Sequence, residues 1–85
     1  MNFVFSGHAK QELINRRISQ AVAESVLQNP EQKFADSEDT VCYQSRVEIN
    51  GKTYLLRLFV NETVDPAVVA TLYRTSKIKK YWRTP

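Results

Sequence analysis

The chain has 85 residues, 42% of them hydrophobic and 25% charged, with a formal net charge of +3. This composition is typical of one small globular domain spanning residues 1–85 and excludes a disordered segment, and a lone cysteine excludes an internal disulfide. One histidine and one cysteine are too few ligands for a structural zinc site. No stretch approaches the roughly 20 apolar residues of a membrane span. We therefore expect a cytoplasmic protein with no metal, cofactor or membrane partner.

Two short helices are predicted after an initial strand. The apolar run Phe3-Val4-Phe5 predicts the strand, and Ser6 can cap a helix from Gly7 to about Arg17 because its hydroxyl can accept a free backbone N–H. Ser19 can cap a second helix over residues 20–28, which an Asn-Pro pair ends.

After these helices the hydrophobic period changes from about 3.6 to about 2, which indicates strands. We predict strands over residues 32–35, 41–49 and 67–73, and Asn50-Gly51 predicts a tight hairpin that pairs Val41 with Val60. The pattern predicts an α+β domain of two layers, in which two N-terminal helices pack on an antiparallel sheet of three to four strands. The helices would cover one sheet face and leave the other open.

The predicted open face carries two arginines, Arg46 and Arg57, on one side of the hairpin. Guanidinium groups bind phosphate through paired hydrogen bonds and stabilise the charge that develops on it during phosphodiester cleavage. The alternative is structural, with these arginines pairing with Glu48 and Gln44 across the hairpin. His8 at the start of the first helix is a candidate general base, and its alternative is packing beside the sheet.

The C-terminal end is the most basic part of the chain. The first 65 residues carry seven basic and nine acidic side chains, whereas the remainder carries five basic side chains and no acidic one. The segment from Tyr73 to Arg83 interleaves aromatic and basic residues, a composition that suits RNA because bases stack on aromatic rings and cations hold phosphates. The alternative is that Tyr81 and Trp82 pack on the core while the lysines face solvent.

Several motifs in a fixed order resemble a short bacterial domain-of-unknown-function family. Its sequences begin Phe-x-x-His-Ala, continue to an Arg-Gly-Ile-Ser junction, and close the second helix on Asn-Pro. The matching segments are Phe5-Ser6-Gly7-His8-Ala9, Arg16-Arg17-Ile18-Ser19, Val26-Leu27-Gln28-Asn29-Pro30, Tyr73-Arg74-Thr75-Ser76-Lys77 and Lys80-Tyr81-Trp82. Two positions depart from the pattern, with Glu12 where many relatives carry Arg and Arg17 where many carry Gly.

That family is similar in layout to the RelE/ParE toxins, so the resemblance implies a RelE/ParE-like two-layer domain. It also implies a toxin of a type II toxin–antitoxin system that cleaves mRNA without a metal, free or on the ribosome, with an antitoxin as partner. The candidate catalytic residues that it implies are His8, Tyr73 and Arg74. The candidate substrate-binding residues are Arg16, Arg46, Arg57, Lys77, Lys79 and Lys80.

Two other functions fit the same sequence. One is a non-catalytic module that binds nucleic acid or protein, and the other is a ParE-like inhibitor of a topoisomerase. An exposed edge strand could also pair with a second copy, so a homodimer is a further expectation.

Overall fold

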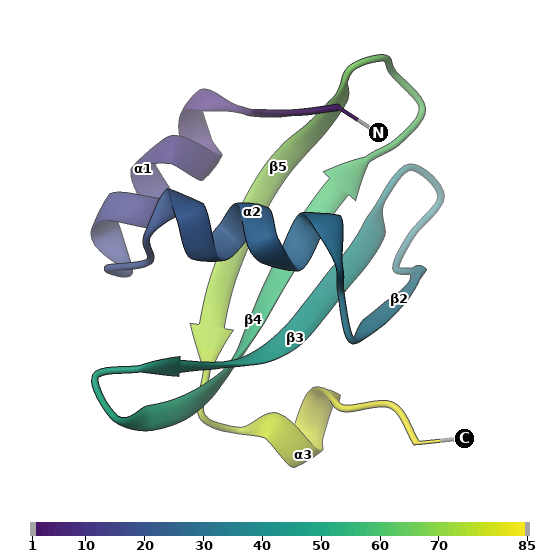
Figure 1. Ribbon diagram of the computed structural model, residues 1–85. Coiled ribbons are helices and arrows are strands. Elements are labelled where there is room, and N and C mark those ends of the chain that lie inside the picture. The colour runs from purple at the N-terminus through teal and green to yellow at the C-terminus, as the bar shows by residue number, and fades with distance from the viewer. Residues whose placement is uncertain (1, 85) are drawn as a thin grey trace.

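The computed structural model describes residues 2–84 and contains one sheet of five strands with order β1-β5-β4-β3-β2 (Figure 1). Three helices accompany the sheet, two of them on one face and the shortest near the C-terminus. The elements in chain order are β1 (Phe3–Phe5), α1 (Gly7–Asn15), α2 (Gln20–Gln28), β2 (Gln32–Ala35), β3 (Val41–Ile49), β4 (Lys52–Asn61), β5 (Ala67–Thr75) and α3 (Ile78–Tyr81).

The sheet corrects the predicted fold class. The predicted antiparallel sheet of three to four strands is wrong, because five strands are present and β1 runs parallel to β5, with Val4 opposite Val68. The Ser6 N–H donates to the Val69 carbonyl at 3.0 Å, which extends this ladder toward α1. A run of three apolar residues carries no signal of its distant partner, so the sequence pattern could not add β1 to the sheet.

The predicted helix caps are confirmed. The Ser6 hydroxyl accepts the backbone N–H of Ala9 at 3.0 Å, and the Ser19 hydroxyl accepts that of Val22 at 3.1 Å. Each bond satisfies an N–H that a helix start leaves without an intrahelical partner. The two caps fix where α1 and α2 begin and therefore how both helices lie on the sheet.

The core lies between these two helices and one face of the sheet. Leu58 and Leu72 are opposite each other on β4 and β5, and both are almost completely buried. The helices contribute Ala9, Leu13, Ala23, Val26 and Leu27 to the same cluster. The predicted hairpin register is confirmed, with Val41 opposite Val60 and Ile49 opposite Lys52.

The second face of the sheet is not open, in contrast to the prediction. The C-terminal segment, residues 78–83, crosses it and bonds to its strands: Gln44 Nε2 donates to the Tyr81 carbonyl at 3.2 Å, and Gln32 Nε2 donates to the Arg83 carbonyl at 2.6 Å. The prediction failed because these contacts join residues that are far apart in the sequence. Between residues 2 and 84, no helix is both long and apolar enough to cross a membrane.

Candidate functional site

The centre of the candidate site is Arg57, a guanidinium buried on the second face of the sheet with only 8% of its surface exposed. Its Nε donates to Gln44 Oε1 at 2.8 Å and its Nη1 donates to the Tyr73 hydroxyl at 2.7 Å. No carboxylate of residues 2–84 forms an ion pair with it. A buried charge without a counter-charge costs free energy, so other contacts have to stabilise Arg57.

Aromatic rings surround the Arg57 guanidinium and supply part of the missing stabilisation. Its central carbon lies 4.4 Å from the ring centroid of Tyr81, 5.2 Å from that of Phe59 and 5.7 Å from that of Tyr73. The rings of Phe59 and Tyr73 are stacked, with centroids 5.9 Å apart and an interplanar angle of 16°. Because α3 supplies Tyr81, the site is complete only when the C-terminal segment is in place.

The two tyrosines of this cluster differ in their proton affinity. Burial raises the pKa of Tyr73, although the bond from Arg57 acts in the opposite direction. Hydrogen bonding with Tyr73 lowers the pKa of Tyr81, and Lys80 adds to that effect. The oxygen of Tyr73 accepts from Arg57 Nη1, and the hydrogen bond between the two tyrosines adds to the rise in the pKa of Tyr73. Tyr73 therefore binds its proton more tightly than Tyr81 does.

His8 reaches the same face of the sheet from the start of α1. Its Nε2 lies 3.1 Å from the hydroxyl oxygen of Thr71 on β5. Thr71 and Tyr73 are opposite Phe59 and Arg57 respectively, so the two β5 residues share one face of the strand. Residues two apart in a strand are separated by about 7 Å, so Thr71, the partner of His8, is the neighbour of Tyr73 on that face of β5.

Arg74 points to the opposite side of β5 from Tyr73, so the three predicted catalytic residues do not form one cluster. Arg74 Nε donates to the Arg16 carbonyl at 2.9 Å, and its guanidinium carbon lies 4.4 Å from the Tyr54 ring centroid. Arg16 connects the two sides, because its own guanidinium carbon lies 5.9 Å from the Tyr73 ring centroid. Its Nε also pairs with Glu12 at 2.5 Å.

Arg74 and Arg16 line a groove of about 640 Å³ at the end of α1. The groove is also lined by Asn15, Arg17, Tyr54, Thr75 and Ser76, and this lining contains no acidic side chain. Three guanidiniums beside hydroxyl groups form a lining that suits a phosphate. We name this hollow the arginine groove.

Arg46 belongs to the fold rather than to either of these sites. Its Nη2 donates to Glu31 Oε2 at 2.8 Å and its Nε donates to Glu31 Oε1 at 3.0 Å, so its charge is neutralised. Glu31, and not the expected Glu48, is the partner, because the chain before β2 returns beside β3. The guanidinium carbon of Arg46 also lies 4.3 Å from the Trp82 ring, which anchors the C-terminal segment.

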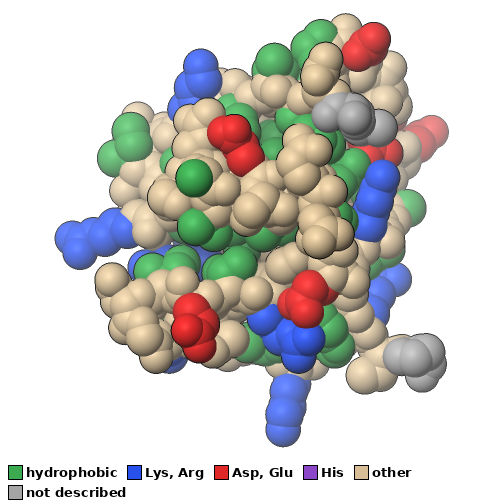
Figure 2. Space-filling model, in the orientation of Figure 1, with side chains coloured by type: hydrophobic (Ala, Val, Ile, Leu, Met, Phe, Trp, Pro, Cys, Tyr) green, Lys and Arg blue, Asp and Glu red, His purple; other side chains and the backbone are tan. Residues whose placement is uncertain are grey.

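The three predicted substrate-binding lysines, Lys77, Lys79 and Lys80, are exposed near α3. Lys80 lies with its Nζ 5.3 Å from the Tyr81 ring centroid. On the face seen in Figure 2, basic side chains lie around the rim rather than over the long helices.

Sequence reasoning missed Thr71 and Arg17 as site residues, whereas the predicted alternative that Gln44 pairs with a hairpin arginine is confirmed for Arg57. Thr71 could have been found from its place two residues before Tyr73 on a predicted strand. The arginine groove could not have been found, because it forms only when the end of α1 meets the end of β5.

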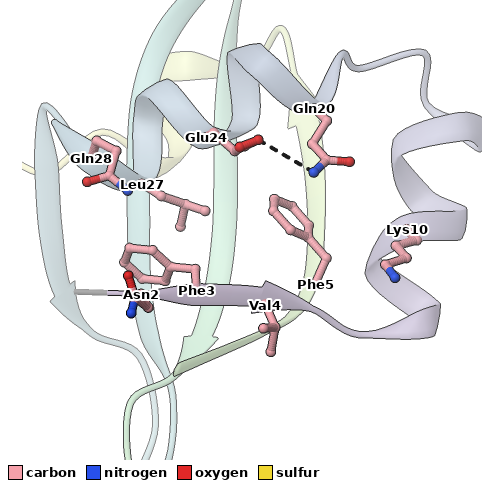
Figure 3. Close-up of a pocket in the computed structure, with 9 residues that line it drawn as sticks. All are labelled: Asn2, Phe3, Val4, Phe5, Lys10, Gln20, Glu24, Leu27 and Gln28. Carbon is pink, nitrogen blue, oxygen red and sulfur yellow. Dashed lines mark hydrogen bonds between the residues drawn. The ribbon is translucent and has the colours of Figure 1, made fainter. Parts of the chain in front are cut away.

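A second groove, of about 440 Å³, lies between β1 and α2 (Figure 3). Its polar residues include Lys10, Gln20 and Glu24, and Gln20 Nε2 donates to Glu24 Oε1 at 3.4 Å. Neither histidine nor arginine nor tyrosine lines it, and none of the predicted site residues lies there. In the described part of the chain no three His, Cys, Asp or Glu side chains gather in a way that could hold a metal ion.

The family described as a domain of unknown function, DUF4258, matches residues 5–74. No curated protein and no solved structure matches the chain. The match covers most of the 85 residues, so the chain belongs to the DUF4258 family. It includes His8, Arg57, Tyr73 and Arg74, whereas Tyr81 lies beyond it.

Proposed function

We propose that this member of the DUF4258 family is a metal-independent endoribonuclease that acts on mRNA as the toxin of a type II toxin–antitoxin system. The observation that carries the proposal is Arg57, a buried cation without a carboxylate partner that holds the hydroxyl of Tyr73. His8 on the same face of β5 supplies a second group able to move a proton. The toxin assignment rests on the resemblance of the sequence motifs to a RelE/ParE-related family.

In the proposed reaction the ribose 2′-hydroxyl attacks the adjacent phosphorus and His8 accepts its proton. The bond from phosphorus to the 5′-oxygen breaks, and Tyr73 donates its hydroxyl proton to that leaving oxygen. The products are a 2′,3′-cyclic phosphate and a 5′-hydroxyl. Water then carries the proton from the His8 imidazolium to the Tyr73 phenolate, which restores both groups.

Arg57 supports this reaction in two ways. Its bond to the Tyr73 oxygen stabilises the phenolate that forms when the proton leaves. Its charge also stabilises the phosphate as negative charge develops there, an effect that is strong where water is excluded. Arg16 has its guanidinium carbon 5.9 Å from the Tyr73 ring centroid and lines the arginine groove, so it lies beside the proposed site.

Induced expression in a bacterium tests the proposal, with total RNA examined during growth. We expect the wild-type chain to arrest growth with loss of mRNA, and we expect His8→Ala and Tyr73→Phe to relieve both effects. Lys10→Ala is the matched control, since Lys10 is an exposed cation on α1 that does not line the arginine groove. Tyr73→Phe keeps the ring that stacks on Phe59 and removes only the hydroxyl.

The other outcomes of this experiment favour the alternative functions. Growth arrest with intact RNA contradicts the ribonuclease and favours a topoisomerase inhibitor. Normal growth with well-folded wild-type protein favours a binding module without catalysis. The antitoxin and the homodimer stay predictions, and rescue of growth by a neighbouring gene is the test for the antitoxin.

A further inference from the structure

The backbone at the end of α1 is strained at one residue, Arg17. The Ile18 N–H donates to the Leu13 carbonyl at 2.9 Å and the Arg17 N–H donates to the Ile14 carbonyl at 3.2 Å, which is the Schellman arrangement that closes a helix. This arrangement places Arg17 at φ 54°, in the left-handed region. Glycine is the usual residue at such a position, because a side chain there meets the following carbonyl group.

The side chain of Arg17 contributes nothing to the fold that offsets this strain. It makes no hydrogen bond, ion pair or ring contact with another of residues 2–84, and it is exposed. A guanidinium that has no partner within the protein and sits on a strained backbone points to a role in binding another molecule. Arg17 lines the arginine groove together with Arg16 and Arg74.

The end of a helix is a poor place for an anion unless its carbonyl groups are occupied, because the helix dipole is negative there. In this chain the carbonyl groups of Glu12, Leu13 and Ile14 accept from backbone N–H groups. The carbonyl of Arg16 accepts from Arg74 Nε at 2.9 Å. The ion pair with Glu12 offsets the charge of Arg16, so the surplus of positive charge in the arginine groove comes from Arg17 and Arg74, and few acceptors there are free.

We propose that the arginine groove binds a phosphate group of single-stranded RNA and that Arg17 is an affinity-determining residue of this site. Arg16 connects the arginine groove to Tyr73, so the bound phosphate belongs to a nucleotide next to the one that is cleaved. The identity of the ligand as RNA rests on the proposed function. The inference that the groove binds a phosphate does not rest on the proposed function, because it follows from the residues that line the groove.

The strain gives Arg17→Gly an unusual pair of expected effects. The substitution removes the left-handed penalty, which outweighs the added freedom of glycine in the unfolded chain, so we expect the melting temperature to rise by about 2–6 °C. It also removes a guanidinium from the groove, so we expect affinity for a single-stranded oligonucleotide to fall by about tenfold. A residue with a structural role would show a loss of stability instead.

The experiment measures binding with an uncleavable 2′-deoxy oligonucleotide by fluorescence anisotropy at several salt concentrations, beside thermal unfolding of each variant. For Arg17→Gly we also expect the slope of log affinity against log salt to fall by about 0.7, the value for one phosphate contact on a single strand. Arg17→Lys keeps the charge and is expected to retain most of the affinity. Lys10→Ala removes one positive charge outside the groove and is the control for net charge.

Unchanged affinity and salt slope in Arg17→Gly overturn the inference, whatever the melting temperature does. An equal loss of affinity in Lys10→Ala overturns it too, because net charge would then explain both results. Cleavage of RNA by the wild type together with unchanged binding by Arg17→Gly refutes the phosphate site and leaves the ribonuclease standing. Weakened binding by Arg17→Gly without any cleavage by the wild type refutes the ribonuclease and leaves the site standing.

Discussion

Replacing Glu31 with glutamine removes the carboxylate that neutralises Arg46. Glu31 Oε1 accepts from the Arg46 backbone N–H at 2.7 Å and from its Nε at 3.0 Å, while Oε2 accepts from Nη2 at 2.8 Å. These bonds lower the pKa of Glu31 from 4.5 to about 2. The ionised carboxylate therefore stabilises the fold, and Arg46 in turn stacks on Trp82 of the C-terminal segment.

The size of the effect follows from the two pKa values. Because the folded-state pKa of Glu31 is depressed, its contribution is fully present above the unfolded value of 4.5 and is lost as the pH falls through about 2. This difference corresponds to at most about 3.4 kcal/mol. The side chains are 38% and 51% exposed, so solvent screening reduces the expected contribution to the free energy of unfolding to about 1 kcal/mol.

Urea unfolding followed by the fluorescence of Trp82 measures this contribution. At pH 7 we expect Glu31→Gln to lower the free energy of unfolding by about 1 kcal/mol, equivalent to about 4–8 °C in melting temperature. The difference between variant and wild type should shrink below pH 4.5 and vanish near pH 2. Glu38→Gln is the control, because Glu38 lies in an exposed turn and forms no ion pair.

A difference that persists unchanged at pH 2 would refute the electrostatic reasoning, since about half of the folded-state carboxylate and nearly all of the unfolded-state carboxylate are then protonated. Equal stability of Glu31→Gln and wild type at pH 7 would refute it as well.

Three further substitutions or treatments test the fold. Ser19→Ala removes the side-chain cap of α2 and should lower the free energy of unfolding by about 1 kcal/mol, measured by chemical denaturation. Ser19→Thr keeps a hydroxyl that can cap the helix and should lower the free energy of unfolding only slightly. Leu58→Ala leaves a cavity at a fully buried position and should lower the free energy of unfolding by about 2–5 kcal/mol in the same measurement. Burial raises the pKa of the Cys42 thiol, so alkylation of Cys42 near pH 8 should be slow in the native protein and fast in urea; fast native labelling would contradict its burial.

Local contacts explain which parts of the fold could be predicted. Ser6 and Ser19 cap helices through bonds that span three residues, and Asn50-Gly51 fixes the register of the β3–β4 hairpin. Residues close in sequence settle all three features, so composition and spacing were enough to predict them. The alternation of side chains along the two hairpin strands, which places Arg46 and Arg57 on one face, could be predicted for the same reason.

Contacts between distant segments explain the rest. The pairing of β1 with β5 and the course of residues 78–83 across the second face depend on bonds between opposite ends of the chain. The choice of Glu31 over Glu48 as the partner of Arg46 depends on where the chain enters β2. The predicted set of site residues divides for a local reason: alternation along β5 sends Tyr73 and Arg74 to opposite faces, and the predicted strand ended at residue 73, before Arg74.

The most direct test of the ribonuclease is cleavage of a short single-stranded RNA by the purified protein in the presence of EDTA. We expect a 2′,3′-cyclic phosphate product, no cut where a 2′-deoxynucleotide replaces the attacked position, and a loss of rate of about 100-fold or more in Tyr73→Phe and His8→Asn. Lys10→Ala should cleave at the wild-type rate. Absence of cleavage by folded wild-type protein, or cleavage that both substitutions leave unchanged, would contradict the proposed site.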